Sequence, residues 1–222
     1  DSALINGALI AVADGMGGHA GGEVASKVAI QTLAEVLPLL NNNEMDPESL
    51  EDFLLNSILD IDSEIRVTAN ADDRLLGMGT TLTALALYRE KVYVLHIGDS
   101  RAYRLRGKEF SQLTKDHSVV QELIDSGAIT EAEAPFHPQR SVLTNVLMGE
   151  GNITPLLISY DVKAGDKFLL CSDGLNNVLS NKEIHDALNT SDPISTLIER
   201  TYSGGAPDNV TVVLAEVGST DS

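Results

Sequence analysis

Apolar residues recur along the first third of the chain with two different periods. Residues 7–13 form a short apolar run rich in Ile, Val and Leu, which predicts a buried strand that stops at Asp14. After a glycine-rich loop, apolar positions recur at helical spacing over residues 24–37. A second helix is predicted over residues 46–65, because an Asp-Pro pair supplies an N-cap and a first-turn proline ahead of an apolar face. We expect the two helices to pack as a pair.

From Gly79 onward the period becomes that of strands. Alternating apolar segments separated by turn signals extend to about Phe110 and predict an antiparallel meander. The remaining elements are a hairpin, two helices and a last strand, at residues 153–172, 180–190, 193–202 and 209–217. Hairpins and adjacent helix pairs without regular βαβ alternation favour an α+β layered sandwich over a doubly wound parallel sheet.

The segment at residues 118–150 differs from the rest of the chain. Residues 118–126 are typical of a short helix closed by Gly127, and residues 128–150 have weak periodicity, two prolines and mixed charge. We predict that residues 118–150 form a surface flap on a single domain spanning residues 1–222. Loops on a rigid scaffold usually carry specificity, so we expect the flap to influence substrate choice.

The chain is strongly acidic, with a formal net charge of -18 from 33 acidic and 15 basic residues. Nucleic-acid binding needs basic patches that displace counterions, so this composition argues against a nucleic-acid partner. The acidity itself has two explanations. It can reflect a well-solvated surface that maintains solubility, or carboxylates that converge and need divalent cations to be tolerated together.

Targeting and redox signals are few. No stretch approaches the roughly 18 consecutive apolar residues of a membrane helix, and no secretory signal is recognisable. The single cysteine, Cys171, cannot form an internal disulfide. It lies on an apolar strand with no phosphate-cradling loop and arginine after it, so we expect an inert buried thiol rather than a nucleophile. We therefore expect a soluble, cytoplasmic and monomeric protein.

Three aspartates stand next to predicted strands. Asp14 and Asp173 each end an apolar run and precede a glycine, and Asp208 lies just ahead of the last strand. Carboxylates at strand ends are held rigidly, and a following glycine lets backbone carbonyls approach an ion, as Mg²⁺ and Mn²⁺ require. Taken singly, each aspartate is more typical of a turn or a cap. Spacing alone does not bring them together.

Six motifs in a fixed order resemble those of a known family. They are VADGMGGHAGGEVAS, GMGTTLTAL, HIGDSRAYR, LTKDHS, LLCSDGL and PDNVTVV. Together they resemble the bacterial branch of the metal-dependent protein phosphatases, the PPM or phosphatase 2C family, from about Leu9 to the C-terminus. The resemblance implies a four-layer αββα sandwich, in which two central, mainly antiparallel sheets are flanked by antiparallel helix pairs.

The resemblance also implies roles for individual residues. Asp14 is similar to the carboxylate that bridges two metal ions, and Gly15 to the residue whose carbonyl ligates the second ion. Asp173 and Asp208 would complete the ligands of the first ion. Asp116, in LTKDHS, matches a bacterial position that joins the equivalent of Asp173 in holding a third, weaker ion. The implied cofactors are Mg²⁺ or Mn²⁺.

The signature also contains polar residues outside the expected ligand set. We expect Thr80 and Thr81 to have an architectural role, and we expect the same of Asp99, through hydrogen bonds to the backbone of its turn. We expect His117 to cap the helix that follows it. Met16 stands where many eukaryotic members have a histidine assigned as the general acid. That acid is therefore unidentified, with metal-bound water or His19 as weak candidates.

The implied activity is hydrolysis of phosphoserine and phosphothreonine on proteins by metal-activated water, without a covalent intermediate. Its substrates would be phosphorylated proteins, and the enzyme would oppose Ser/Thr kinases. The alternative is a catalytically impaired, phosphoprotein-binding regulatory pseudophosphatase. Retention of the aspartates favours the enzyme.

The chain departs from the family pattern at its start. Members usually begin with a strand carrying a phosphate-binding arginine, followed by an Asn-Glu-Asp or Asn-Gln-Asp segment, and neither occurs here. Residues 1–4 lead almost directly onto the strand before Asp14. A central sheet without its first strand would expose an unpaired edge, so we expect the native protein to have upstream residues.

Overall fold

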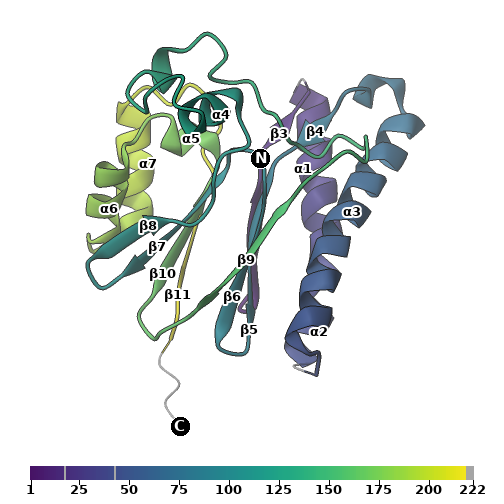
Figure 1. Cartoon of the computed structure of the whole chain (residues 1–222), viewed down its shortest axis with the longest axis horizontal. Coiled ribbons are helices and arrows are strands. Elements are labelled where there is room, and N and C mark those ends of the chain that lie inside the picture. The colour runs from purple at the N-terminus through teal and green to yellow at the C-terminus, as the bar shows by residue number, and fades with distance from the viewer. Residues whose placement is uncertain (18, 43, 219–222) are drawn as a thin grey trace.

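Two antiparallel sheets form the centre of the molecule (Figure 1). The computed structural model describes residues 1–17, 19–42 and 44–218. The first sheet has the strand order β1-β2-β5-β6-β9, with bounds Ser2–Ile5, Leu9–Ala13, Leu82–Tyr88, Lys91–Ile97 and Leu156–Asp161. The second has the order β11-β10-β7-β8, with bounds Val212–Glu216, Lys167–Cys171, Arg101–Arg106 and Glu109–Gln112. A short ribbon pairs β3 (Gly15–Met16) with β4 (Gly79–Thr80).

Helices lie on the outer side of each sheet (Figure 1). Beside the five-stranded sheet are α1 (His19–Ala34), α2 (Leu37–Asn42) and α3 (Pro47–Ala71), and beside the four-stranded sheet are α5 (Asp173–Asn176), α6 (Asn181–Leu188) and α7 (Pro193–Ser203). The segment predicted to form a flap, residues 118–150, contains α4 (Val119–Asp125) and the 3-10 turn η2 (Ala134–Phe136), and η1 (Asp73–Leu75) follows α3. Among the described residues, no helix is both long enough and apolar enough to cross a membrane.

Three clusters of buried hydrophobic side chains hold these elements together. One contains Val12 and Val94 of the first sheet with Phe168 and Leu170 of the second. A second joins the first sheet to α1 and α3, and a third joins the second sheet to α6 and α7. Successive strand residues point to opposite faces, so Leu169 of β10 enters the third cluster while its two neighbours face the other sheet. Strand β10 is therefore apolar on both faces.

The α+β class with antiparallel sheets is confirmed, but several element bounds differ from the predictions. The second predicted helix continues to Ala71, six residues past its expected end at 65. The chain does not lead directly onto the strand before Asp14, because β1 pairs with β2 in a hairpin whose register sets Ser2 opposite Ala13. Strand β1 has only four residues before the Asn6-Gly7 turn, and polar and apolar positions alternating over so short a segment are too weak a pattern to predict a strand.

Ile58 on α3 gives a test of the packing between this helix and the first sheet. Its side chain is fully buried, whereas its neighbour Leu59 is 50% exposed. Ile58→Ala should lower the free energy of unfolding by about 2–5 kcal/mol, since the cavity left behind adds to the lost burial. Leu59→Ala should cost less than about 1 kcal/mol. Denaturant unfolding of the two variants measures both, and equal losses would contradict this packing.

Candidate metal centre

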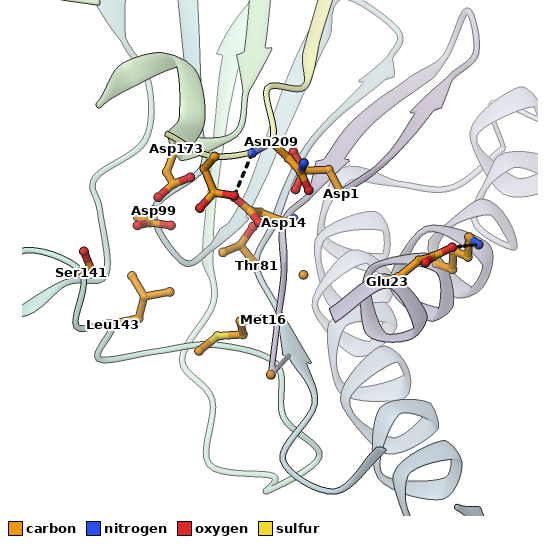
Figure 2. Close-up of a pocket in the computed structure, with 14 residues that line it drawn as sticks. Asp1, Asp14, Met16, Glu23, Thr81, Asp99, Ser141, Leu143, Asp173 and Asn209 are labelled. Atoms are coloured by element: carbon orange, nitrogen blue, oxygen red, sulfur yellow. Dashed lines mark hydrogen bonds and ion pairs between the residues drawn. The ribbon is translucent and has the colours of Figure 1, made fainter. Parts of the chain in front are cut away.

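A cavity of about 710 Å³ opens where ends of both sheets meet the flap (Figure 2). Its lining is rich in carboxylates and poor in apolar side chains. The residues that line it are Asp1, Asp14, Gly15, Met16, Gly17, Glu23, Lys27, Thr81, Asp99, Ser141, Leu143, Asp173, Asp208 and Asn209. Lys27 is ion-paired with Glu23 at 2.6 Å, so its charge is already compensated by a neighbour on α1.

The cavity brings together three aspartates that spacing alone could not join. Asp14 follows β2 of the first sheet, Asp173 begins α5 directly after β10 of the second, and Asp208 precedes β11. Gly15, also proposed from the sequence, lies in the same lining. Segments next to strands of the two sheets thus bring these carboxylates to one cavity.

The electrostatics of Asp14 show how crowded these carboxylates are. Burial, followed by the nearby charge of Asp173, raises the pKa of Asp14 to about 8, and Asp99 and Asp208 act in the same direction. Burial also raises the pKa of Asp173, and the nearby charge of Asp208 acts in the same direction. Like charges in a half-buried site cannot all ionise unless something positive compensates them. A divalent cation would do so, which is why these residues fit a metal ion.

Two threonines for which the sequence predicted an architectural role, Thr80 and Thr81, fix the backbone of Asp14. The Thr80 hydroxyl donates to the Asp14 carbonyl at 2.8 Å, and the Asp14 amide donates to the Thr81 hydroxyl at 3.1 Å. The Thr81 amide also donates to the Asp14 carbonyl. Thr81 is held in turn by the Ser100 hydroxyl at 2.8 Å. The architectural role of Thr80 and Thr81 is confirmed.

Asp99 was assigned to its turn, but its side chain lines the cavity instead (Figure 2). Burial, then the charges of Asp173 and Asp116, raises its pKa to about 7. Gly98 precedes it with φ +107°, and a Cβ there would lie 2.5 Å from the Thr81 side chain. The sequence contained a signal that could have placed Asp99 in the cavity, because Asp99 lies just after a strand, as Asp14 and Asp173 do.

Asp116 does not line the cavity. Both of its oxygens accept hydrogen bonds from Arg101, at 2.8 Å from Nε and 2.7 Å from Nη2. The paired carboxylate raises the pKa of the Arg101 guanidinium, and a two-pronged guanidinium pair of this kind is a strong one. The geometry therefore gives the expected third-ion role of Asp116 no support, because Arg101 occupies the oxygens that an ion would need.

Asp1 is a cavity residue that the sequence analysis passed over. The β1–β2 register sets Ser2 opposite Ala13, which carries Asp1 to the end of the hairpin beside Asp14. The Thr211 hydroxyl donates to its carboxylate at 2.8 Å. No local pattern distinguishes this residue, because only strand pairing brings it to the site.

Comparison with known proteins decides the family. The model of the protein phosphatase 2C family matches residues 2–216. The chain belongs to the protein phosphatase 2C family. It is 43% identical over 220 residues to the serine/threonine protein phosphatase PstP of Mycobacterium tuberculosis, covering 98% of this chain and 42% of PstP. It is 36% identical to the serine/threonine phosphatase stp of Listeria welshimeri, covering 95% of this chain and 85% of stp.

Solved phosphatase structures share its fold. A crystal structure of M. tuberculosis PstP/Ppp matches with a TM-score of 0.89 at 42% identity, over 98% of this chain and 92% of that one. The crystal structure of the PstP catalytic domain in complex with two manganese ions matches with a TM-score of 0.86 at 39% identity. The match covers 98% of this chain and 91% of that one. The chain spans less than half the length of the whole PstP protein.

Two glycines let the backbone of this phosphatase 2C-family chain close around the site. A Cβ on Gly15 would lie 1.9 Å from the Gly22 carbonyl oxygen of α1, and one on Gly174 would lie 1.9 Å from the Asn209 carbonyl oxygen. Real Cβ atoms do not tolerate such distances, so both positions need glycine. Each glycine follows a cavity aspartate, which explains the Asp-Gly pairs seen in the sequence.

Two other residues of the phosphatase motifs, His117 and Cys171, do not line the cavity. The His117 amide donates to the Gly98 carbonyl at 2.7 Å, and its Nδ1 accepts from the Gly98 amide at 3.1 Å. The prediction that His117 caps the next helix is wrong, because Ser118 is the N-cap of α4. Cys171 is fully buried, as predicted, and burial raises the pKa of its thiol to about 12. The side chain of His19 lies outside the described residues.

The raised pKa of Asp14 predicts how Mn²⁺ affinity depends on pH. Below its pKa of about 8, Asp14 in the metal-free protein holds a proton that an incoming cation must displace. Affinity for Mn²⁺ should therefore rise about tenfold per pH unit between about pH 6 and 8, and level off above that. Calorimetry in buffers of different ionisation enthalpy measures both the affinity and the proton released. Affinity that is constant below pH 8 would contradict this assignment.

Proposed function

We propose that this chain is a protein phosphatase catalytic domain, built as one four-layer αββα sandwich with a flap at about residues 118–150. It would hydrolyse phosphoserine and phosphothreonine on proteins by direct attack of water, in the cytoplasm and as a monomer. The observation that carries the proposal is the convergence of Asp14, Asp173 and Asp208 in one cavity. The family membership and the manganese-bound PstP structure support it.

The donor set suits Mn²⁺ or Mg²⁺, which are bound by oxygen ligands and often retain several waters. Within the described ranges, no group of three or more His, Cys, Asp or Glu side chains is arranged so that it could hold a metal ion by itself. Ligation would therefore combine carboxylates with the Gly15 carbonyl and water. Two such ions would supply an activated water at neutral pH and stabilise charge on the phosphoryl oxygens.

The chain's own residues would divide this work by their positions. Asp14 lies between the two sheets and would bridge both ions, while Asp173 and Asp208 would hold one of them from the second sheet. Asp99 lies beside Asp173 and is the better candidate for a third ion, since Asp116 is engaged by Arg101. Protein nucleophiles are unnecessary here, and the buried Cys171 could not serve as one.

Loss of Asp173 tests the activity. With Mn²⁺, the protein should hydrolyse a phosphothreonine peptide, and EDTA should abolish the reaction. Asp173→Ala should lower kcat/KM by more than about 100-fold, beyond the 10–100-fold loss typical of groups outside the ligand set. The control is Asp52→Asn, an exposed aspartate of α3. Wild-type protein that folds and binds Mn²⁺ but does not turn over would shift the proposal to a phosphoprotein-binding pseudophosphatase.

Asp99 and Asp116 should separate catalysis from stability. Asp99→Asn should lower kcat with little loss of stability, because it removes a crowded negative charge from the cavity. Asp116→Asn should lower the free energy of unfolding by about 3–5 kcal/mol, since it leaves the largely buried Arg101 unpaired. Turnover across a Mn²⁺ series and denaturant unfolding of each variant measure the two effects. The reverse pattern would return the third-ion role to Asp116.

A further inference from the structure

Asp62 is a buried acidic residue in the middle of α3. Asp62 is only 4% exposed, and its neighbours Ile61 and Ile65 on the helix are fully buried. A charged side chain within a helix face that packs on a sheet is costly to bury unless hydrogen bonds satisfy it. The partners of Asp62 therefore indicate what the residue does.

Those partners are backbone amides from the far end of the flap. Oδ1 accepts from the amides of Met148 at 3.1 Å and Gly149 at 2.7 Å, and Oδ2 accepts from the amide of Gly151 at 2.8 Å. Gly149 and Gly151 have φ of +79° and +73°. Consecutive amides in a turn of this kind form a concave site for an anion, and here the anion is the carboxylate of the protein itself.

The turn at residues 148–151 also lies directly against the helix. A Cβ on Gly149 would lie 2.6 Å from Cβ and 2.7 Å from Cα of Arg66, four residues after Asp62 on α3. The close approach leaves no room for a side chain. Both the carboxylate and the glycine thus fix the turn to α3.

From this turn the chain leads back to the cavity. Leu147 exchanges backbone hydrogen bonds with Thr80, at 2.9 and 3.0 Å, and the Thr80 hydroxyl holds the Asp14 carbonyl. Ser141 and Leu143, just before this contact, form the flap side of the cavity (Figure 2). The other end of the flap is held by the pairing of Ser118 with Leu143.

We propose that Asp62 is a positioning residue that clamps the end of the flap to α3 and so holds the Ser141–Leu143 wall over the carboxylates. The proposal rests on the phosphatase function proposed above. The aspartates themselves follow β2, begin α5 and precede β11, and none of them belongs to the flap. Loss of the clamp should therefore loosen the wall more than it displaces the main metal ligands. A phosphopeptide, which must pass the wall, should be affected more than a small phosphate ester.

The first measurement is amide hydrogen exchange of the whole chain with Asp62→Ala. Exchange at residues 141–151 should accelerate by about tenfold or more, while α6 should be unchanged. Asp60→Asn, an exposed change on the same helix, should leave both unchanged. Unaltered exchange at residues 141–151, or an equal increase throughout the chain, would overturn the clamp.

The second measurement is the kinetic effect of the same variant. KM for a phosphothreonine peptide should rise about fivefold or more, whereas KM for p-nitrophenyl phosphate and the affinity for Mn²⁺ should change less than about twofold. Equal losses on both substrates, or unchanged peptide kinetics despite faster exchange, would overturn the positioning role. If the wild-type protein hydrolyses neither substrate, the proposed function fails, and the exchange result alone decides whether Asp62 fixes the flap.

Should Asp62→Ala fail to fold, Gly149→Ala reaches the same contact from the flap side. Its Cβ would meet the Arg66 backbone, so the turn must leave α3 while Asp62 remains. The matched control is Gly107→Ala, because Gly107 also has positive φ, at +59°, but has nothing within 4 Å of the added Cβ. Gly149→Ala should reproduce the accelerated exchange and the raised peptide KM. A Gly149→Ala protein that behaves like Gly107→Ala would overturn the proposal.

Discussion

Repulsion among the carboxylates that line one cavity is the constraint on which the rest of the structure depends. Burial and mutual proximity raise the pKa of Asp14 to about 8 and that of Asp99 to about 7. Such an arrangement is unfavourable for the protein alone and becomes favourable with bound cations. The fold must therefore hold these groups in place against their own repulsion, and strand ends in two packed sheets provide that rigidity.

Close backbone contacts supply the remaining precision. Gly15 and Gly174 each permit an approach that no other residue would allow, and each directly follows a carboxylate of the cavity. The Thr80 hydroxyl joins the Asp14 carbonyl to the ribbon that also pairs with the flap. The carboxylate cavity, the helices on one sheet and residues 118–150 are thus connected through backbone groups, which are less free to move than long side chains.

The sequence predicted the fold class and much of the site because both depend partly on local pattern. Strand and helix periods depend on which faces are buried, so the antiparallel α+β architecture could be expected. Asp14, Asp173 and Asp208 were found because each lies beside an apolar strand. Their convergence was expected only through the family motifs, since spacing does not encode distance between segments far apart in the chain.

Tertiary structure alone decided the rest. Asp1 reaches the cavity through strand register, and Asp62 meets amides more than 80 residues away. Asp116 pairs with Arg101, whereas Asp99 lines the cavity, and no local pattern in the sequence predicts this pairing. The sequence by itself determined which segments are buried and which of these segments are followed by an aspartate. Which carboxylates meet, and which are neutralised by a neighbouring side chain, depended on contacts that form only when the whole chain packs.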